Sequence, residues 1–201
     1  NTVYSKEFNT TVDRTAPTVT ITTPKEDSTK TGINAIEEAS YKFEGGVIEE
    51  NSLSGIYYAI KKKNDSAPAA VSAGIDALDS SKWTENGFTG ANAGTASWNF
   101  YQQFNSGTTD ESGNLSEGQD YTLYVYAVDK AGNVSTQQSR KFDVDLSAPA
   151  VTSSVTKNTY NSTDLSSNSG SFDVTGTASD TYGLASVIVH AKKSDGTEKT
   201  L

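Results

Sequence analysis

The chain has 201 residues, of which 34% are apolar, and its 25 acidic and 16 basic side chains give a formal net charge of −9. Binding along a phosphate backbone needs clustered Lys and Arg, so this acidic balance disfavours a nucleic-acid partner. The absence of Cys excludes disulfides, thiolate metal sites and cysteine catalysis, and a single His leaves little scope for acid–base chemistry.

Short segments in which apolar and polar residues alternate follow one another along the chain, with turn residues between them. This period of two is typical of β-strands. The pattern predicts strands over residues 18–22, 41–45, 55–62, 95–101, 121–129 and 137–143. The alternation should turn Val19, Phe43, Ile56, Trp98 and Leu123 inward. Short strands without a helical period predict an all-β fold, and specifically a β-sandwich.

An internal repeat organises these strands into units of about 130 residues. Residues 12–19 match residues 144–151 at a shift of 132. At a shift of 131 the matching pairs are Phe43 with Val174, Gly45 with Gly176, Ile56 with Val187 and Lys61 with Lys192. Residues 14–145 are therefore expected to form one complete domain. Residues 1–13 should hold the last strand of a preceding domain, and residues 146–201 only the first three strands of a following one. The chain is expected to be part of a longer protein.

Three segments carry a family resemblance. Residues 121–133, YTLYVYAVDKAGN, resemble the penultimate strand and hairpin of bacterial immunoglobulin-like domains, which commonly show the pattern Tyr-x-x-x-Val-x-Ala-x-Asp-x-Ala-Gly-Asn. The linker at 13–17 is similar to the family's Asp-x-Thr-Ala-Pro junction, and residues 176–187 are similar to its second-to-third strand loop. The resemblance implies immunoglobulin-like sandwiches in tandem, as in large secreted or surface adhesin-type proteins. It does not cover residues 63–105, which we interpret as an insertion.

Tyr121 occupies the place that an immunoglobulin-type sandwich gives to its tyrosine corner. In that motif the phenolic hydroxyl bonds the backbone of the turn just upstream. Leu123 then takes the position of the second Cys of an antibody domain, and its packing against Phe43 and Trp98 should replace the disulfide.

The implied topology brings acidic residues together at one end of the domain. The start of the first strand, the second-to-third strand loop and the penultimate hairpin would gather Asp13, Glu49, Glu50, Asn51, Asp129 and Asn133. Of these, Asp13, Glu49 and Asp129 are the predicted metal ligands. Ca²⁺ takes six to eight oxygen ligands, and adhesins that resemble this chain hold calcium at such junctions. We therefore predict a calcium site there, with Asp145 and Asp180 at the next joint. The alternative is that each Asp only caps its own turn or strand end.

Tyr57, Tyr124 and Tyr126 have the parity opposite to the core set, so they should lie on the outer face of one sheet. Together with Trp83 they could stack on sugar rings or bind a partner. The alternative is that the inserted segment folds over them as a second small core, because open aromatic faces are uncommon on stable monomers.

Catalysis is not expected. The acidic pairs at 37–38 and 110–111 lack the facing arrangement that a glycosidase needs, and His190 has no second His or Cys with which to form a metal cluster or triad.

These features predict a non-catalytic structural or adhesive spacer of a long extracellular bacterial surface or secreted protein. Its partners would be neighbouring immunoglobulin-like domains of the same chain and a host or surface glycan or protein receptor. No membrane span is expected in this segment, since no apolar stretch approaches ~18 residues. Two alternatives remain: a carbohydrate-binding accessory module of a secreted polysaccharide-degrading enzyme, and a subunit of an extracellular filament or surface layer.

Overall fold

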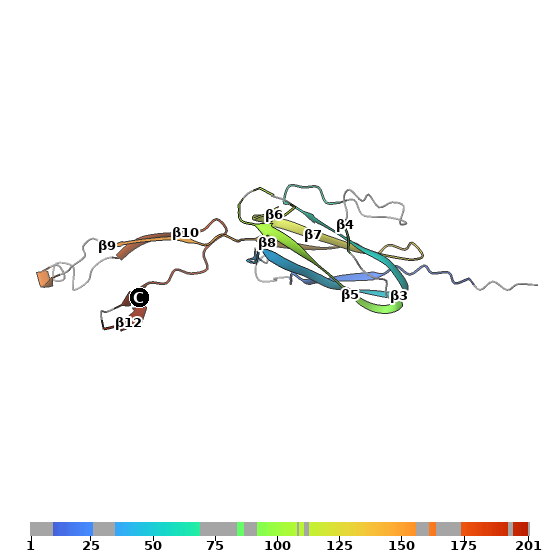
Figure 1. The fold of residues 1–201 in the computed structure, drawn as a ribbon, viewed down its shortest axis with the longest axis horizontal. Helices are drawn as coiled ribbons and strands as arrows, with labels where there is room; N and C mark the ends of the chain where they lie inside the picture. Colours follow the sequence, from blue (N-terminus) through green and yellow to red (C-terminus); the bar gives the residue numbers. More distant parts are fainter. Residues whose placement is uncertain are drawn as a thin grey trace, which may run out of the picture. The chain divides into compact units, whose positions relative to one another are not determined.

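The computed structural model describes residues 10–25, 35–68, 84–86, 92–107, 109–110, 113–155, 161–163, 174–192 and 195–200. The chain divides into two compact units, Asn1–Leu146 and Ser147–Leu201, and each is considered by itself (Figure 1). Most of the described residues lie in β-strands, which confirms the prediction of an all-β chain. In the described part, no helix has the length and apolar character that crossing a membrane requires.

Eight strands build the sheet of the first unit. They are β1 (Thr18–Thr23), β2 (Ala35–Ile36), β3 (Ser40–Lys61), β4 (Thr84–Asn86), β5 (Asn92–Asn105), β6 (Leu115–Ser116), β7 (Gly118–Asp129) and β8 (Gln138–Val144). The order along the sheet is β2-β8-β7-β3-β5-β6, and β1 and β4 also pair with β3. Every pair is antiparallel except β2–β8 and β5–β6, which are parallel.

The long strand β3 belongs to two groups of strands. Its first half pairs with β1 and β5, and its second half pairs with β7 and β4. The sequence predicted two separate strands here, over 41–45 and 55–62, and that expectation is wrong. The pairing shifts register between Glu49 and Ser52 and again between Leu53 and Gly55. Such irregularities bend a strand, so β3 can pass from one group to the other without a break.

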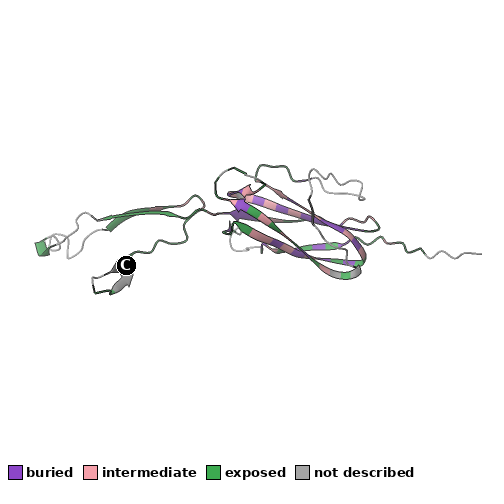
Figure 2. Cartoon of the chain, viewed as in Figure 1, coloured by how far each residue is buried: buried purple, intermediate pink, exposed green. Residues whose placement is uncertain are grey.

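Side chains from both strand groups meet in one core. Phe43 of β3 stacks on Phe100 of β5, with ring centroids 5.2 Å apart, and lies 5.1 Å from Phe142 of β8. Phe43 and Leu123 are both fully buried, as the alternation predicted. Trp98 is also buried, and its indole nitrogen donates a hydrogen bond to the Thr20 carbonyl oxygen at 3.2 Å. Figure 2 shows the buried residues concentrated in this unit.

The hydrogen bond expected from a tyrosine corner at Tyr121 is present. The Tyr121 hydroxyl donates to the Ser116 carbonyl oxygen at 2.8 Å, and the ring is buried against Phe142. The bond fixes the short strand β6 to the start of β7.

The second unit holds two strand pairs: β9 (Ala150–Val155) with β10 (Val174–Ser179), and β11 (His190–Lys192) with β12 (Glu198–Thr200). The β9–β10 register reproduces the β1–β3 register. In the first unit Val19 faces Val47 and Ile21 faces Gly45. Adding 132 to the first residue of each pair and 131 to the second gives Val151 with Ala178 and Ser153 with Gly176, the pairs that the structure contains.

A glycine in β3 allows β1 and Trp98 to approach closely. A Cβ atom at Gly45 would overlap the Thr20 carbonyl oxygen and the Trp98 ring, whereas a Cβ atom at Gly46 meets only the Thr20 hydroxyl at 3.3 Å and the Ala96 carbonyl at 3.7 Å. Gly176, the repeat equivalent of Gly45, makes the same close approach to the carbonyl of Thr152. The spacing between the paired strands therefore depends on this glycine in both units.

We predict that Gly45→Ala lowers the free energy of unfolding by about 1–3 kcal/mol, because the new methyl group overpacks the contact with Thr20 and Trp98. Gly46 is the next residue and faces the opposite side of the strand, so Gly46→Ala should change the free energy of unfolding by less than ~1 kcal/mol. Urea denaturation followed by intrinsic fluorescence measures both. Equal losses for the two variants would contradict the packing argument.

Candidate metal site

Three carboxylates from distant parts of the sequence converge at one end of the first unit. Asp13 comes from the segment before β1, Glu49 from the first irregularity in β3 and Asp129 from the end of β7. One oxygen atom of each lies within 4.8 Å of the oxygens of the other two. The structure thus brings together the three residues that the sequence assigned to the first calcium site.

The hairpin after β7 orients Asp129, which is fully buried. Its Oδ1 accepts a hydrogen bond from the Asn133 backbone N–H at 2.8 Å, and its Oδ2 accepts one from Asn133 Nδ2 at 2.8 Å. Gly132 provides the positive φ of 89° that the turn requires. Asp129 therefore does cap its own turn, as the simpler interpretation expected, and it also faces two other carboxylates.

Asn133 also connects the hairpin to the segment before β1. Its Nδ2 donates a second hydrogen bond, at 3.3 Å, to the backbone carbonyl oxygen of Asp13. Asp13 in turn accepts the backbone N–H of Thr15 at 3.0 Å through Oδ1. The sequence placed Asn133 in a tight hairpin, but it carried no signal for this contact across 120 residues.

Glu49 has a buried carboxylate oxygen that makes no hydrogen bond. The residue is 4% exposed, and its Oε1 accepts the backbone N–H of Asn51 at 2.8 Å. Its Oε2 is buried and has no hydrogen-bond partner. An unpaired oxygen on a buried charged group is costly, and this atom lies free to accept a further hydrogen bond or to coordinate a cation.

The three carboxylates of the cluster also repel one another. Two full negative charges 4.8 Å apart repel by about 3 kcal/mol at an effective dielectric constant of ~20. No described Lys or Arg forms an ion pair with these three carboxylates. The ion pairs among the described residues are Lys42–Glu44, Lys62–Asp110 and Lys63–Asp120. A site with only oxygen ligands and excess negative charge suits a hard divalent cation such as Ca²⁺.

The two residues predicted for the next joint lie in different units, and the structure describes each alone. Asp180 accepts the backbone N–H of Tyr182 at 2.8 Å. A shift of 131 maps this contact onto the one between Glu49 and Asn51. Asp145 donates its backbone N–H to the Ile36 carbonyl oxygen at 3.0 Å. The acidic cluster found among the described residues includes neither Asp145 nor Asp180.

Of the two alternatives for the outer-face tyrosines, an open stacking face or a second small core, the structure contains a second small core. Tyr126 is 1% exposed, so its assignment to an exposed stacking surface is wrong. It stacks on Tyr57 with centroids 5.2 Å apart, and Tyr57, Tyr124 and Val134 pack around it. Burial, and secondarily the nearby Tyr57, raises the pKa of Tyr126 above its usual range. Trp83, the fourth residue of the expected face, lies outside the described residues.

The remaining titratable candidates do not belong to the acidic cluster found among the described residues. Asp110 forms an ion pair with Lys62 at 2.8 Å and accepts the Ser116 backbone N–H, while Glu111 lies outside the described residues. Glu37 and Glu38 are exposed, and so is His190 in the second unit.

No protein-family model matches the chain, and no curated protein matches it.

We predict that Asn133→Ala destabilises the first unit by about 1–3 kcal/mol in calcium-free buffer, because buried Asp129 loses a charge-assisted hydrogen bond. Asn51→Ala is the matched control, since only its backbone N–H bonds the cluster, and we expect a change within ~0.5 kcal/mol. Urea denaturation measures both, and a harmless Asn133→Ala would contradict the role given to this amide.

Proposed function

We propose that residues 14–145 form an immunoglobulin-like domain within a tandem array. The strand pairing supports this proposal. One group consists of β1, the first half of β3 and β5, and the other of β8, β7 and the second half of β3, with β2 alongside β8. This division into two groups around one core supports the assignment, because an immunoglobulin-type sandwich packs two groups of antiparallel strands face to face. The buried Tyr121 corner is a further feature of that class.

The tandem arrangement is supported by the second unit. Its first strand pair keeps the register of the first unit, the close approach at the equivalent glycine and the hydrogen bond at the equivalent acidic residue. A chain of such units has a mechanical use, because folded blocks joined by short proline-containing linkers hold their ends apart. We infer a non-catalytic structural or adhesive spacer of a long extracellular bacterial protein, whose partners are neighbouring domains and a receptor.

The observation that carries the functional proposal is the acidic cluster, in which Glu49 and Asp129 are buried and Asp13 is half-buried, together with the unpaired Glu49 oxygen. Asp13, Glu49 and Asp129 would hold a Ca²⁺ ion, which supplies the positive charge that the cluster lacks. Because Asp13 belongs to the segment that enters the domain, a cation shared with Glu49 and Asp129 fixes that segment to the domain body. The joint would then bend less when calcium is bound.

A carbohydrate-binding accessory module is the weaker alternative, because the buried Tyr126 removes the centre of the expected stacking face. No observation favours the filament or surface-layer alternative over the spacer.

We predict that calcium binds the chelator-treated chain and stabilises the first unit. At free Ca²⁺ 100-fold above the dissociation constant the gain is ~2.7 kcal/mol, or ~5–10 °C in melting temperature. Glu49→Gln should abolish this gain, because it removes a carboxylate from the site. In chelator the same variant should be at least as stable as the parent, because one repulsive charge is gone. Isothermal titration calorimetry and thermal unfolding measure these effects.

Glu50→Gln is the matched control, because Glu50 is the exposed neighbour of Glu49 on the same strand. It should retain both the heat of binding and the thermal shift. A parent chain that gives no heat and no thermal shift with CaCl₂ would remove the proposal. So would a Glu49→Gln variant that responds to calcium as the parent does.

A further inference from the structure

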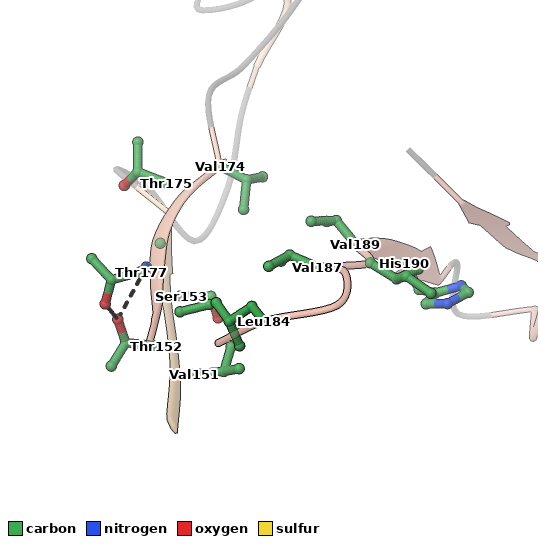
Figure 3. Close-up of a pocket in the computed structure, with 13 residues that line it drawn as sticks. Val151, Thr152, Ser153, Val174, Thr175, Thr177, Leu184, Val187, Val189 and His190 are labelled. Carbon is green, nitrogen blue, oxygen red and sulfur yellow. Dashed lines mark hydrogen bonds between the residues drawn. The ribbon is translucent and has the colours of Figure 1, made fainter. Parts of the chain in front are cut away.

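The second unit exposes a group of large apolar side chains around an open hollow of about 490 Å³. The exposed fractions are 43% for Val174, 40% for Leu184, 60% for Val187 and 41% for Val189. Figure 3 shows these side chains around the hollow, which β9 and β10 bound on one side. Clustered exposed apolar side chains on a soluble protein indicate a contact surface.

The repeat shows what these positions do in a complete unit. At a shift of 131, three of these positions correspond to residues of the first unit: Val174 to Phe43, Leu184 to Leu53 and Val187 to Ile56. At a shift of 132, Val151, which also lines the hollow, corresponds to Val19. All four equivalents are core residues, with exposed fractions of 0%, 1%, 0% and 3%. Val151 itself is 67% exposed. Apolar character is thus kept at each position while burial is not.

The first unit also shows which elements cover these positions. Phe43 contacts Phe142 of β8, and Ile56 and Tyr58 pair with Ala127 and Val125 of β7. In the second unit β10 ends at Ser179 and β11 begins at His190. Residues 184–189 therefore form no strand in the described part of this unit, whereas their equivalents in β3 pair with β7, with one register shift between Leu53 and Gly55. Both the side chains and the backbone lack the partner that a β7-like strand provides.

We propose that this face docks the β7–β8 hairpin of a further copy of the repeat. The β7-like strand pairs its backbone with residues 184–189, as β7 pairs with residues 53–58. Its inward side chains, equivalent to Leu123 and Val125, fill the hollow beside Val174 and Val187. This mode of recognition is the addition of β-structure to an open edge with burial of alternate side chains. The inference rests on the repeat in the proposed function and is independent of the calcium site.

The test joins a second copy of residues 115–146 to the end of the full chain 1–201 through a flexible Gly/Ser linker. The linker raises the effective concentration of the added hairpin to the millimolar range. Hydrogen exchange at the alternate amides of residues 187–189 that point toward the added strand, measured in chelator, should become at least ~10-fold slower than in the parent chain. The control carries Leu123→Asp and Val125→Asp in the added copy only, and it should exchange like the parent.

Two results would overturn the proposal. The first is equal exchange at these amides in the fusion protein, its control and the parent chain. The second is a parent chain that is dimeric by light scattering and already protected there, because two copies would then cover each other's faces. Calcium titration of the same fusion protein separates the two hypotheses. A normal calcium response with no added protection removes only the docking proposal, and the reverse result removes only the calcium site.

Discussion

The pairing of β3 with two different groups of strands is the constraint on which the first unit depends. Its first half holds β1 and β5, its second half holds β7 and β4, and the bend between them lies at Glu49–Gly55. The bend brings the two groups together around Phe43 and Leu123. The same irregularity presents the Glu49 carboxylate where the segment before β1 and the end of β7 meet. The core and the acidic cluster are therefore two consequences of one strand geometry.

Much of this fold could be predicted from local sequence. Alternation identified Phe43, Trp98 and Leu123 as core residues, because side chains in a strand point to its two faces in turn. The repeat related β9–β10 to β1–β3 before any register was known. The continuity of β3 could not be predicted, because pairing with β5 and β7, far along the chain, decides whether a bent segment remains in a ladder. The three residues of β4 show no apolar alternation, so they carried no signal.

The sequence could predict which residues form the site, but it could not predict their hydrogen bonds and burial. Sequence order and an implied topology were enough to group Asp13, Glu49 and Asp129. That Glu49 retains an unpaired buried oxygen follows from the positions of backbone donors, which residue types do not encode. Tyr126 shows the same limit. Its parity placed it correctly on the side opposite the main core, but its burial results from Tyr57 on the neighbouring strand, a contact set by register.

Comparison of the two units shows that the burial of an apolar residue depends on the strands around it as well as on its own side chain. Val187 and Ile56 are equivalent and both apolar, yet one is 60% exposed and the other fully buried. The β9–β10 pair has the register of β1 with β3, although the described residues of the second unit include no equivalents of β7 and β8. Hydrophobic burial is the main favourable term in folding, so under the docking proposal a unit would gain much of its stability when its last hairpin packs. Calcium at Asp13, Glu49 and Asp129 would act after that step, because Asp129 reaches the cluster only when β7 has paired with β3. The proposed stiffening of a joint therefore requires a complete domain beside it.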